Sequence, residues 1–305
     1  MVNIKVERFK NNPIIYPELD SSIGSNIAGP SLIRVPSWID NSLGKYYLYF
    51  SAHKGTYIRL AYADNLGGPW EIYKKGSLHL NDSFFPTEPP KNNVNKKLLV
   101  DAVFHIASPD VHVIEEKKEI RMYFHGLGSK GRQLTRVAIS NDGIHFKAKP
   151  EILSPSYLRV FHFKGYYYGM SMPGIFYRSL NGLTNFERGA ILFSVKMRHS
   201  ALRVVDNQLQ VFWTQVGDAP ERILLSYIDL TDDWSKWKAS DPIEILRPEK
   251  DWEGGDLEAI PSVRDAINEK ACQLRDPAIF EEDNKTYMLY SVAGERGIAI
   301  AELIS

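Results

Sequence analysis

The sequence predicts an all-β fold, a five-bladed β-propeller. Three observations lead to it: one segment pattern recurs along the 305 residues, Tyr, Phe and Trp make up 12% of the chain, and no apolar run keeps a helical period. Four-stranded units repeated around an axis leave few exposed sheet edges, and this is how propellers are built. An open β-sandwich of unrelated strands is the alternative.

The recurring segment has the same order of parts in each copy. A short apolar strand is followed by a turn, an aromatic-rich strand, a polar hairpin loop, an alternating strand and a last strand that opens with Trp or Phe. The copies begin at Gly29, Ser108, Ser154 and Arg198. A fifth copy opens at Leu274, but the chain ends after three of its strands.

The missing strand is predicted at the other end of the chain. Residues 7–17, ERFKNNPIIYP, are similar to residues 144–155, IHFKAKPEILSP, which form the last strand of the second copy. We therefore expect the N-terminal strand to complete the fifth blade and close the ring. Residues 1–305 would then form a single propeller domain.

Composition excludes several classes of partner. The 37 Lys and Arg residues balance the 37 Asp and Glu residues, and neither a nucleic-acid surface nor an anionic membrane surface is indicated. Cys272 is the only cysteine, so no internal disulfide can form. The N-terminus is charged where a signal peptide needs an apolar core, and no long apolar run follows. We expect a cytoplasmic protein with no membrane contact.

Antiparallel topology predicts which residues share a face of the propeller. The starts of the innermost strands, the loops between second and third strands, and the connections between blades must lie together. The strand starts contain Gly29, Ser108 to Asp110, Ser154, Arg198, His199, Arg275 and Asp276, and the hairpin loops contain His53, His125, Glu295 and Arg296. Connections 79–107 and 247–273 are too long for plain turns, and such loops are usually functional.

Two blade openings resemble those of a known family. SPDV followed by KKEIRMYFHG, and RDPAIF followed by NKTYMLYS, are similar to five-bladed propeller glycosidases of the arabinanase and β-xylosidase type. Fructan hydrolases, β-mannoside phosphorylases and anhydrosugar-releasing enzymes are relatives of that family. The resemblance covers the repeat pattern over nearly the whole chain, and it implies a hydrolase acting on an oligosaccharide or polysaccharide.

The resemblance also implies three axial carboxylates: a base, a second Asp that positions the substrate, and a Glu acid. Asp110 and Asp276 match two of these motif positions. The other copies open with Gly29, Ser154 and the Arg198-His199 pair, so the triad is not carried over intact, and a third carboxylate would have to come from a loop. Anhydrosugar-releasing relatives are thought to use a histidine as the acid, which makes His199 a candidate.

Glycoside hydrolysis requires a proton donor and a carboxylate on either side of the bond. We expect Asp276 to be the base or nucleophile, kept ionised by Arg275, with His199 or Glu258 as the acid. Glu258 lies on the connection DWEGGDLEAIPSVRD. Short loops on most blades suggest a pocket closed on one side, hence exo action. The predicted substrate-binding residues are Arg275, Arg198, His105, His125, His53, Trp252, Glu295 and Arg296.

Other functions stay open from the sequence. A polysaccharide lyase would use arginine to neutralise a uronate and a His or Tyr as base, and a non-catalytic propeller would only bind carbohydrate. A phosphorylase would need several cations around the pocket. No EF-hand loop or zinc-ligand spacing is present, so no cofactor is expected, with an axial Ca²⁺ left open. The sequence does not specify the sugar, the linkage, the stereochemical course or the oligomeric state.

Overall fold

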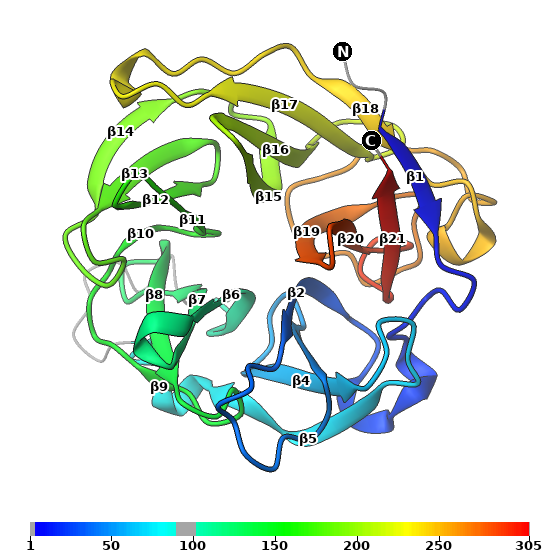
Figure 1. The fold of residues 1–305 in the computed structure, drawn as a ribbon. Coiled ribbons are helices and arrows are strands. Elements are labelled where there is room, and N and C mark those ends of the chain that lie inside the picture. Colours follow the sequence, from blue (N-terminus) through cyan, green and yellow to red (C-terminus); the bar gives the residue numbers. More distant parts are fainter. Residues whose placement is uncertain (1–3, 90–101, 305) are drawn as a thin grey trace.

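The computed structural model describes residues 4–89 and 102–304 and arranges them as a ring of five blades around one axis (Figure 1). Each blade is an antiparallel sheet whose first strand is innermost. The predicted fold class is therefore confirmed. Residues 90–101, within the predicted connection 79–107, lie outside the described residues.

The strands of the five blades follow in order from the inside of each blade to its outside. Blade I contains β2 (Ala28–Arg34), β3 (Tyr46–Ser51), β4 (Tyr57–Ala63) and β5 (Glu71–His79). Blade II contains β6 (Ile106–Ile114), β7 (Glu119–Leu127), β8 (Gln133–Ser140) and β10 (Ser154–Pro155), with β9 (Lys147–Ala148) also paired to β8. Blade III contains β11 (Arg159–Phe163), β12 (Tyr166–Ser171), β13 (Ile175–Ser179) and β14 (Glu187–Ile191).

The remaining two blades bring the chain termini together. Blade IV contains β15 (Met197–Val205), β16 (Gln208–Gln215), β17 (Ile223–Asp229) and β18 (Ile243–Leu246). Blade V contains β19 (Arg275–Glu282), β20 (Lys285–Ser291), β21 (Ile298–Ile304) and, outermost, β1 (Lys5–Arg8). The described helices are short 3₁₀ turns: η1 (Pro17–Leu19), η2 (Ser21–Ile23), η3 (Leu80–Asp82), η4 (Glu115–Lys117), η5 (Trp234–Lys236) and η6 (Asp251–Glu253). Within the described ranges, no helix is long and apolar enough to span a membrane.

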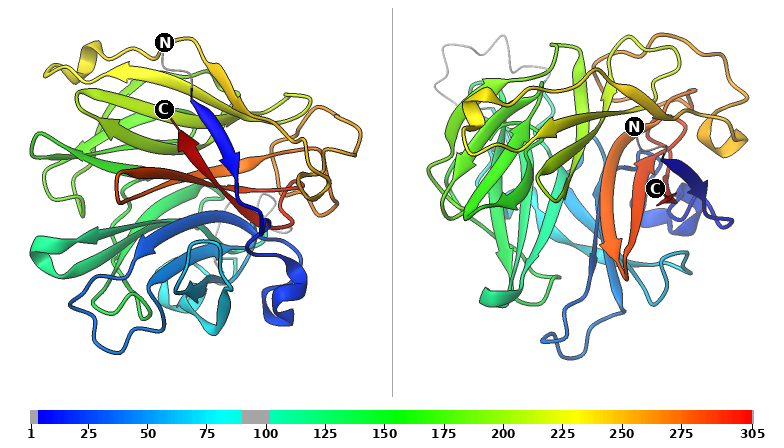
Figure 2. Two further views of the ribbon diagram at one scale, coloured as in Figure 1. Left: turned by 45° about the vertical axis from the view of Figure 1, so that its right-hand side comes forward. Right: turned by 45° about the horizontal axis from the view of Figure 1, so that its top comes forward.

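The N-terminal strand closes the ring, as predicted. β1 runs antiparallel to β21, from Lys5 opposite Ile304 to Arg8 opposite Ala301 (Figure 2). The strand ends earlier than the predicted 7–17, because regular pairing stops at Arg8. Beyond it, Phe9 and Ile14 donate to single carbonyls of β21, and Ile15 forms an isolated bridge with Ile298. The last blade is thus assembled from both ends of the chain.

Both faces of each blade are buried, which explains the aromatic-rich middle strands. In β3, Tyr47 and Tyr49 pack toward blade II, whereas Leu48 and Phe50 pack toward blade V. Successive strand residues point to opposite faces, so one continuous apolar run supplies two interfaces. Five apolar clusters result, one at each interface between neighbouring blades. Full burial of one such side chain contributes roughly 1.5–3 kcal/mol.

Every blade places one residue with a left-handed backbone at the start of its inner strand. These axial residues are Gly29 (φ 63°), Ser108 (51°), Tyr157 (64°), His199 (32°) and Asp276 (48°). In four blades the register of the inner strand shifts at this position, between Ala28 and Ser31, Ala107 and Asp110, Arg198 and Ser200, and Arg275 and Ala278. Such bulges redirect a side chain, and strained backbone of this kind is concentrated at functional sites.

The axial positions correct the sequence alignment in two blades. In blade II the axial residue is Ser108, and Asp110 lies beyond the bulge, opposite Tyr123. In blade III it is Tyr157, because Ser154 and Pro155 form the outer strand of blade II instead of opening a new one. Gly29 is required in blade I, since a Cβ there would lie 3.0 Å from the Cα of Ser108.

Candidate active site

A pocket of about 340 Å³ opens at the axial residues. It combines one carboxylate and three histidines from the blades with a segment of the connection 247–273. Its lining comprises Ala28, Ser51, His53, Ser108, His125, Gln133, Ser156, Tyr157, Met172, Pro173, Arg198, His199, Arg264, Asp265 and Asp276. Residues from all five blades thus contribute to one site, as the topology predicted.

Asp276 is held at the bottom of this pocket by side chains from other strands. Tyr157 donates a hydrogen bond from its hydroxyl to Oδ1 over 2.8 Å, and Ser291 donates from Oγ to Oδ2 over 3.2 Å. His199 Nε2 lies 3.5 Å from Oδ1. The carboxylate is only 4% exposed, and each oxygen keeps a lone pair available for a ligand.

His199 lies beside Asp276 as an uncharged ring. Arg198 donates to His199 Nε2 from Nε over 3.2 Å and from Nη2 over 3.0 Å, so this nitrogen is an acceptor. Burial, together with the positive charges of Arg198 and Arg275, holds the pKa of His199 well below its ordinary value. A ring without a second proton is a poor proton donor at neutral pH. His199 therefore reaches the site as predicted, but in a form that does not favour the acid role.

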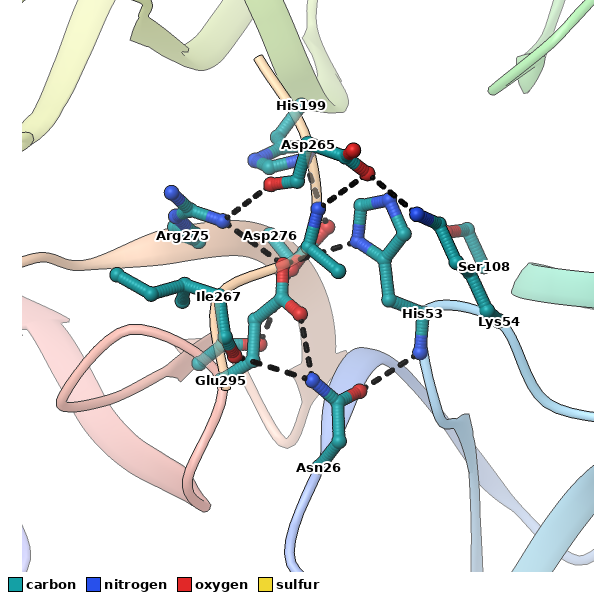
Figure 3. A network of polar contacts seen from close by, with 12 residues as sticks. Asn26, His53, Lys54, Ser108, His199, Asp265, Ile267, Arg275, Asp276 and Glu295 are labelled. Carbon is teal, nitrogen blue, oxygen red and sulfur yellow. Dashed lines mark hydrogen bonds and ion pairs between the residues drawn. The ribbon is translucent and has the colours of Figure 1, made fainter. Parts of the chain in front are cut away.

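Arg275 does not line the pocket, and Figure 3 shows its guanidinium directed toward Glu295 and the backbone of Asp265. Its guanidinium donates to Glu221 Oε2 over 3.2 Å, to Glu295 Oε1 over 2.8 Å and to Gln273 Oε1 over 2.6 Å. The prediction that Arg275 binds substrate is therefore wrong, because this fully buried side chain is occupied by other partners. It connects the carboxylates that support the pocket wall.

Glu295 orients His53, which lines the pocket (Figure 3). Glu295 Oε1 lies 2.9 Å from His53 Nδ1, and Oε2 accepts from Asn26 over 2.8 Å. Burial alone would raise the pKa of Glu295, but the hydrogen bond and charge of His53 and the charge of Arg275 bring it down to about 2. Glu295 is thus an ionised support and does not itself line the pocket.

His125 lines the pocket and His105 supports it from behind. The two rings meet edge to face with centroids 5.9 Å apart, and His105 Nδ1 lies 2.7 Å from the Val103 carbonyl oxygen. Burial lowers the pKa of both histidines, well below its ordinary value for His125. Both rings are therefore uncharged at neutral pH, and His125 can hydrogen-bond a ligand in the pocket.

Arg159 fills the space beneath Tyr157. Its guanidinium lies 4.1 Å from the centroid of the Tyr157 ring and donates to the backbone carbonyls of Ser108, Pro109 and Ser200. Calcium takes six to eight oxygen ligands, whereas here a guanidinium already binds the available carbonyls. Among the described residues no group of three or more His, Cys, Asp or Glu side chains is placed to hold a metal. The residues present do not fit an axial Ca²⁺.

Four predicted site residues lie away from the pocket. Asp110 binds His112 Nε2 over 2.8 Å and the Val160 amide over 2.8 Å; burial would raise its pKa, but His112 and Arg159 lower it. Glu258 is exposed on its loop, and Trp252 packs against the apolar cluster between blades IV and V. Arg296 donates to the Asn268 carbonyl over 3.4 Å. These four assignments are corrected: none of them faces the site.

Among the residues that the sequence interpretation missed, Tyr157, Arg264 and Asp265 line the pocket, and Glu221 lies behind it. Tyr157 was hidden by the misplaced opening of blade III. Arg264 and Asp265 lie on the connection 247–273, which was predicted to be functional, but six or more residues beyond Glu258. Glu221 is fully buried between Arg198 and Arg275, and burial raises its pKa. No local motif marks it, since its two arginine partners come from distant strands.

The fold is shared with solved structures. A proposed glycoside hydrolase from Bacteroides ovatus superposes with a TM-score of 0.66 at 12% identity, over 99% of this chain and 97% of that one. A second, from Parabacteroides distasonis, gives 0.65 at 14% identity, over 99% and 97%. A family-43 β-xylosidase/α-arabinofuranosidase from a compost microbial metagenome, in complex with xylotriose, gives 0.61 at 12% identity, over 98% and 95%. The chain has the five-bladed propeller fold of family-43 glycoside hydrolases.

A sequence relative places the chain in a family. The chain matches no protein-family model. It is 35% identical, over an alignment of 332 positions, to the uncharacterized protein R118 of Acanthamoeba polyphaga mimivirus, covering 98% of this chain and 90% of that protein. The chain belongs to the same family as this mimivirus protein.

Proposed function

We propose that the protein is a glycoside hydrolase that acts on an oligosaccharide or polysaccharide through Asp276. One observation carries the proposal: Asp276 is the only carboxylate among the five axial residues, and hydroxyls of Tyr157 and Ser291 hold it in a pocket. A carboxylate so placed can activate a water or attack the anomeric carbon. The shared fold with a xylotriose-binding β-xylosidase/α-arabinofuranosidase supports this assignment.

Asp265 is the candidate for the second carboxyl group that hydrolysis requires. It lines the pocket from the connection 247–273 and is 57% exposed, while Asp276 is 4% exposed. In the free protein burial would raise its pKa, but the ion pair with Lys54, at 2.9 Å, lowers it. A sugar that displaces Lys54 would remove this stabilisation of the anion, and Asp265 could then donate a proton to the leaving oxygen.

The size of the pocket supports release of a terminal sugar. Its volume of about 340 Å³ is at the lower end of the roughly 300–1,000 Å³ range of ligand pockets. Tyr157 and the buried Arg159 close its floor. A chain end fits such a closed pocket, whereas the middle of a polysaccharide needs an open groove.

The test is an ¹H NMR assay of the wild type and Asp276→Asn against a panel of plant and algal oligosaccharides. The wild type should release a new reducing sugar, and the variant should be slower by at least about 100-fold, as expected for loss of an acid–base group. Asp110→Asn is the matched control, because its carboxylate lies outside the pocket, and it should keep the wild-type rate per folded molecule. Equal rates for Asp276→Asn and the wild type would refute the proposal.

A polysaccharide lyase is the second candidate, and one observation favours it. The uncharged His199 and the guanidinium of Arg198 lie side by side in the pocket, where a base and a uronate-binding cation would be needed. The same assay separates the two reactions, since a lyase yields an unsaturated uronate with alkene proton signals. Broadened sugar signals without any product would instead indicate a binding propeller.

A further inference from the structure

One wall of the pocket presents two arginines that lack a hydrogen-bonded carboxylate. Arg198 comes from β15 and is buried, with a side chain 3% exposed. Its pairing with Glu221 joins Nε to Oε1 over 3.8 Å, which is beyond hydrogen-bond distance. Arg264 lies at the mouth and, among the described residues, forms no ion pair; its Nη2 donates to the Val195 carbonyl over 2.7 Å.

The two arginines belong to the same wall because the side chain of each binds a backbone carbonyl close to the other in sequence. Arg198 donates from Nη1 to the Val263 carbonyl over 2.8 Å, directly before Arg264. Arg264 in turn binds Val195, three residues before Arg198. Glu221, the carboxylate that pairs with Arg198 at 3.8 Å, is also bound more closely by Arg275, at 3.2 Å. The burial of Arg198 is therefore compensated only in part, and this burial lowers its pKa. An anionic ligand would offset the remaining cost.

The arginine wall lies next to the catalytic carboxylate. Arg198 binds His199 Nε2 over 3.0 Å, and Asp276 Oδ1 lies 3.5 Å from the same nitrogen. A group held by Arg198 would therefore be separated from Asp276 by a single imidazole. The distance suits a substituent on the sugar ring that Asp276 addresses.

We propose that the pocket binds a sugar bearing an anionic substituent, a carboxylate or a sulfate, against the wall formed by Arg198 and Arg264. This inference rests on the proposed function, because it takes the ligand to be a sugar. It narrows the substrate class to sugars that carry an anionic group. Guanidinium groups bind oxyanions such as these through paired, charge-assisted hydrogen bonds. The neutral Ser51, Ser108 and Gln133 remain to bind hydroxyls.

The test is saturation-transfer NMR of the wild type with matched monosaccharides: glucuronate, galacturonate and mannuronate against glucose, galactose and mannose, with glucose 6-sulfate as a further arm. These ligands contain no glycosidic bond, so binding is measured independently of hydrolysis. At least one acid should bind about tenfold more tightly than its neutral partner, with a preference that weakens in salt. Preference for the uronate alone identifies a carboxylate, and preference for the sulfate identifies a sulfate ester.

Variants of Arg264 test whether the preference for acidic sugars depends on the arginine wall. Arg264→Gln should reduce the preference by about tenfold, and Arg264→Lys should retain part of it. Arg188→Gln removes an exposed arginine of the outer strand β14 and should leave it unchanged. Equal binding of acid and neutral sugars, absent binding of both, or an unaffected preference in Arg264→Gln would overturn the inference. Preferred binding of an acid without cleavage of any glycan would refute the hydrolase proposal instead.

Discussion

At the residue scale, the site depends on charges that are neutralised within the protein. Arg275 joins Glu221 to Glu295, and Glu295 orients His53 at the pocket. Removing one member would leave a buried charge without its partner, which costs more than the intact pair contributes. These residues are supports, whereas Asp276, Tyr157 and Arg198 line the pocket.

Because Glu295 is buried and ionised, we predict that the unfolding free energy of the protein falls in acid. The pKa of Glu295 falls from an ordinary 4.5 to about 2 in the folded protein, so the unfolded chain binds more protons between these values. The contribution is fully present above about pH 4.5 and is lost as the pH falls toward 2. By about pH 3 the wild type should lose about 2 kcal/mol more unfolding free energy than Glu295→Gln.

Urea denaturation across this pH range measures the difference. Glu258→Gln changes an exposed glutamate outside the network and should follow the wild-type curve. Parallel curves for the wild type and Glu295→Gln would show that the carboxylate is not held ionised by its neighbours.

At the element scale, the recurring order of strands could be predicted from the sequence, but the bulges in the inner strands could not. A middle strand such as β3 is a continuous apolar run because its blade buries both faces. One additional residue at a bulge changes which side chain points to the axis. Ser108 and Asp276 both have a left-handed backbone, and each is followed by a proline. An alignment on these prolines would have matched Ser108, not Asp110, with Asp276.

A second prediction concerns the contribution of the closing strand β1 to stability. Arg8 binds the fully buried Glu253 through Nε at 2.8 Å and Nη2 at 3.1 Å. Arg8→Ala should lower the unfolding free energy by about 3–5 kcal/mol, since a buried carboxylate loses its cation. The matched control Lys5→Ala removes an exposed ion pair with Glu7 and should change it by less than about 1 kcal/mol.

Thermal denaturation followed by circular dichroism provides the comparison. If both variants lower the melting temperature by a similar small amount, β1 contributes little to closure of the ring. A large shift for Arg8→Ala alone would support ring closure through the contact between Arg8 and Glu253.

At the scale of the whole molecule, five blades bring residues from across the chain into one pocket. Asp276, Tyr157 and His199 come from three blades, and Asp265 comes from a long connection. The sequence predicted the ring and the pocket face because these follow from repeat order and antiparallel topology. It did not predict Tyr157 or Glu221, because their roles depend on contacts with strands far away in sequence.

The most direct measurement is the size of the products released over time from an oligosaccharide labelled at its reducing end, for the wild type and Asp276→Asn. We predict that the first product is a monosaccharide from the unlabelled end, that the labelled chain shortens by one unit at a time, and that Asp276→Asn releases almost none. A mixture of internal fragments would contradict the closed pocket. Equal release by Asp276→Asn would contradict the assignment of Asp276 as the catalytic carboxylate.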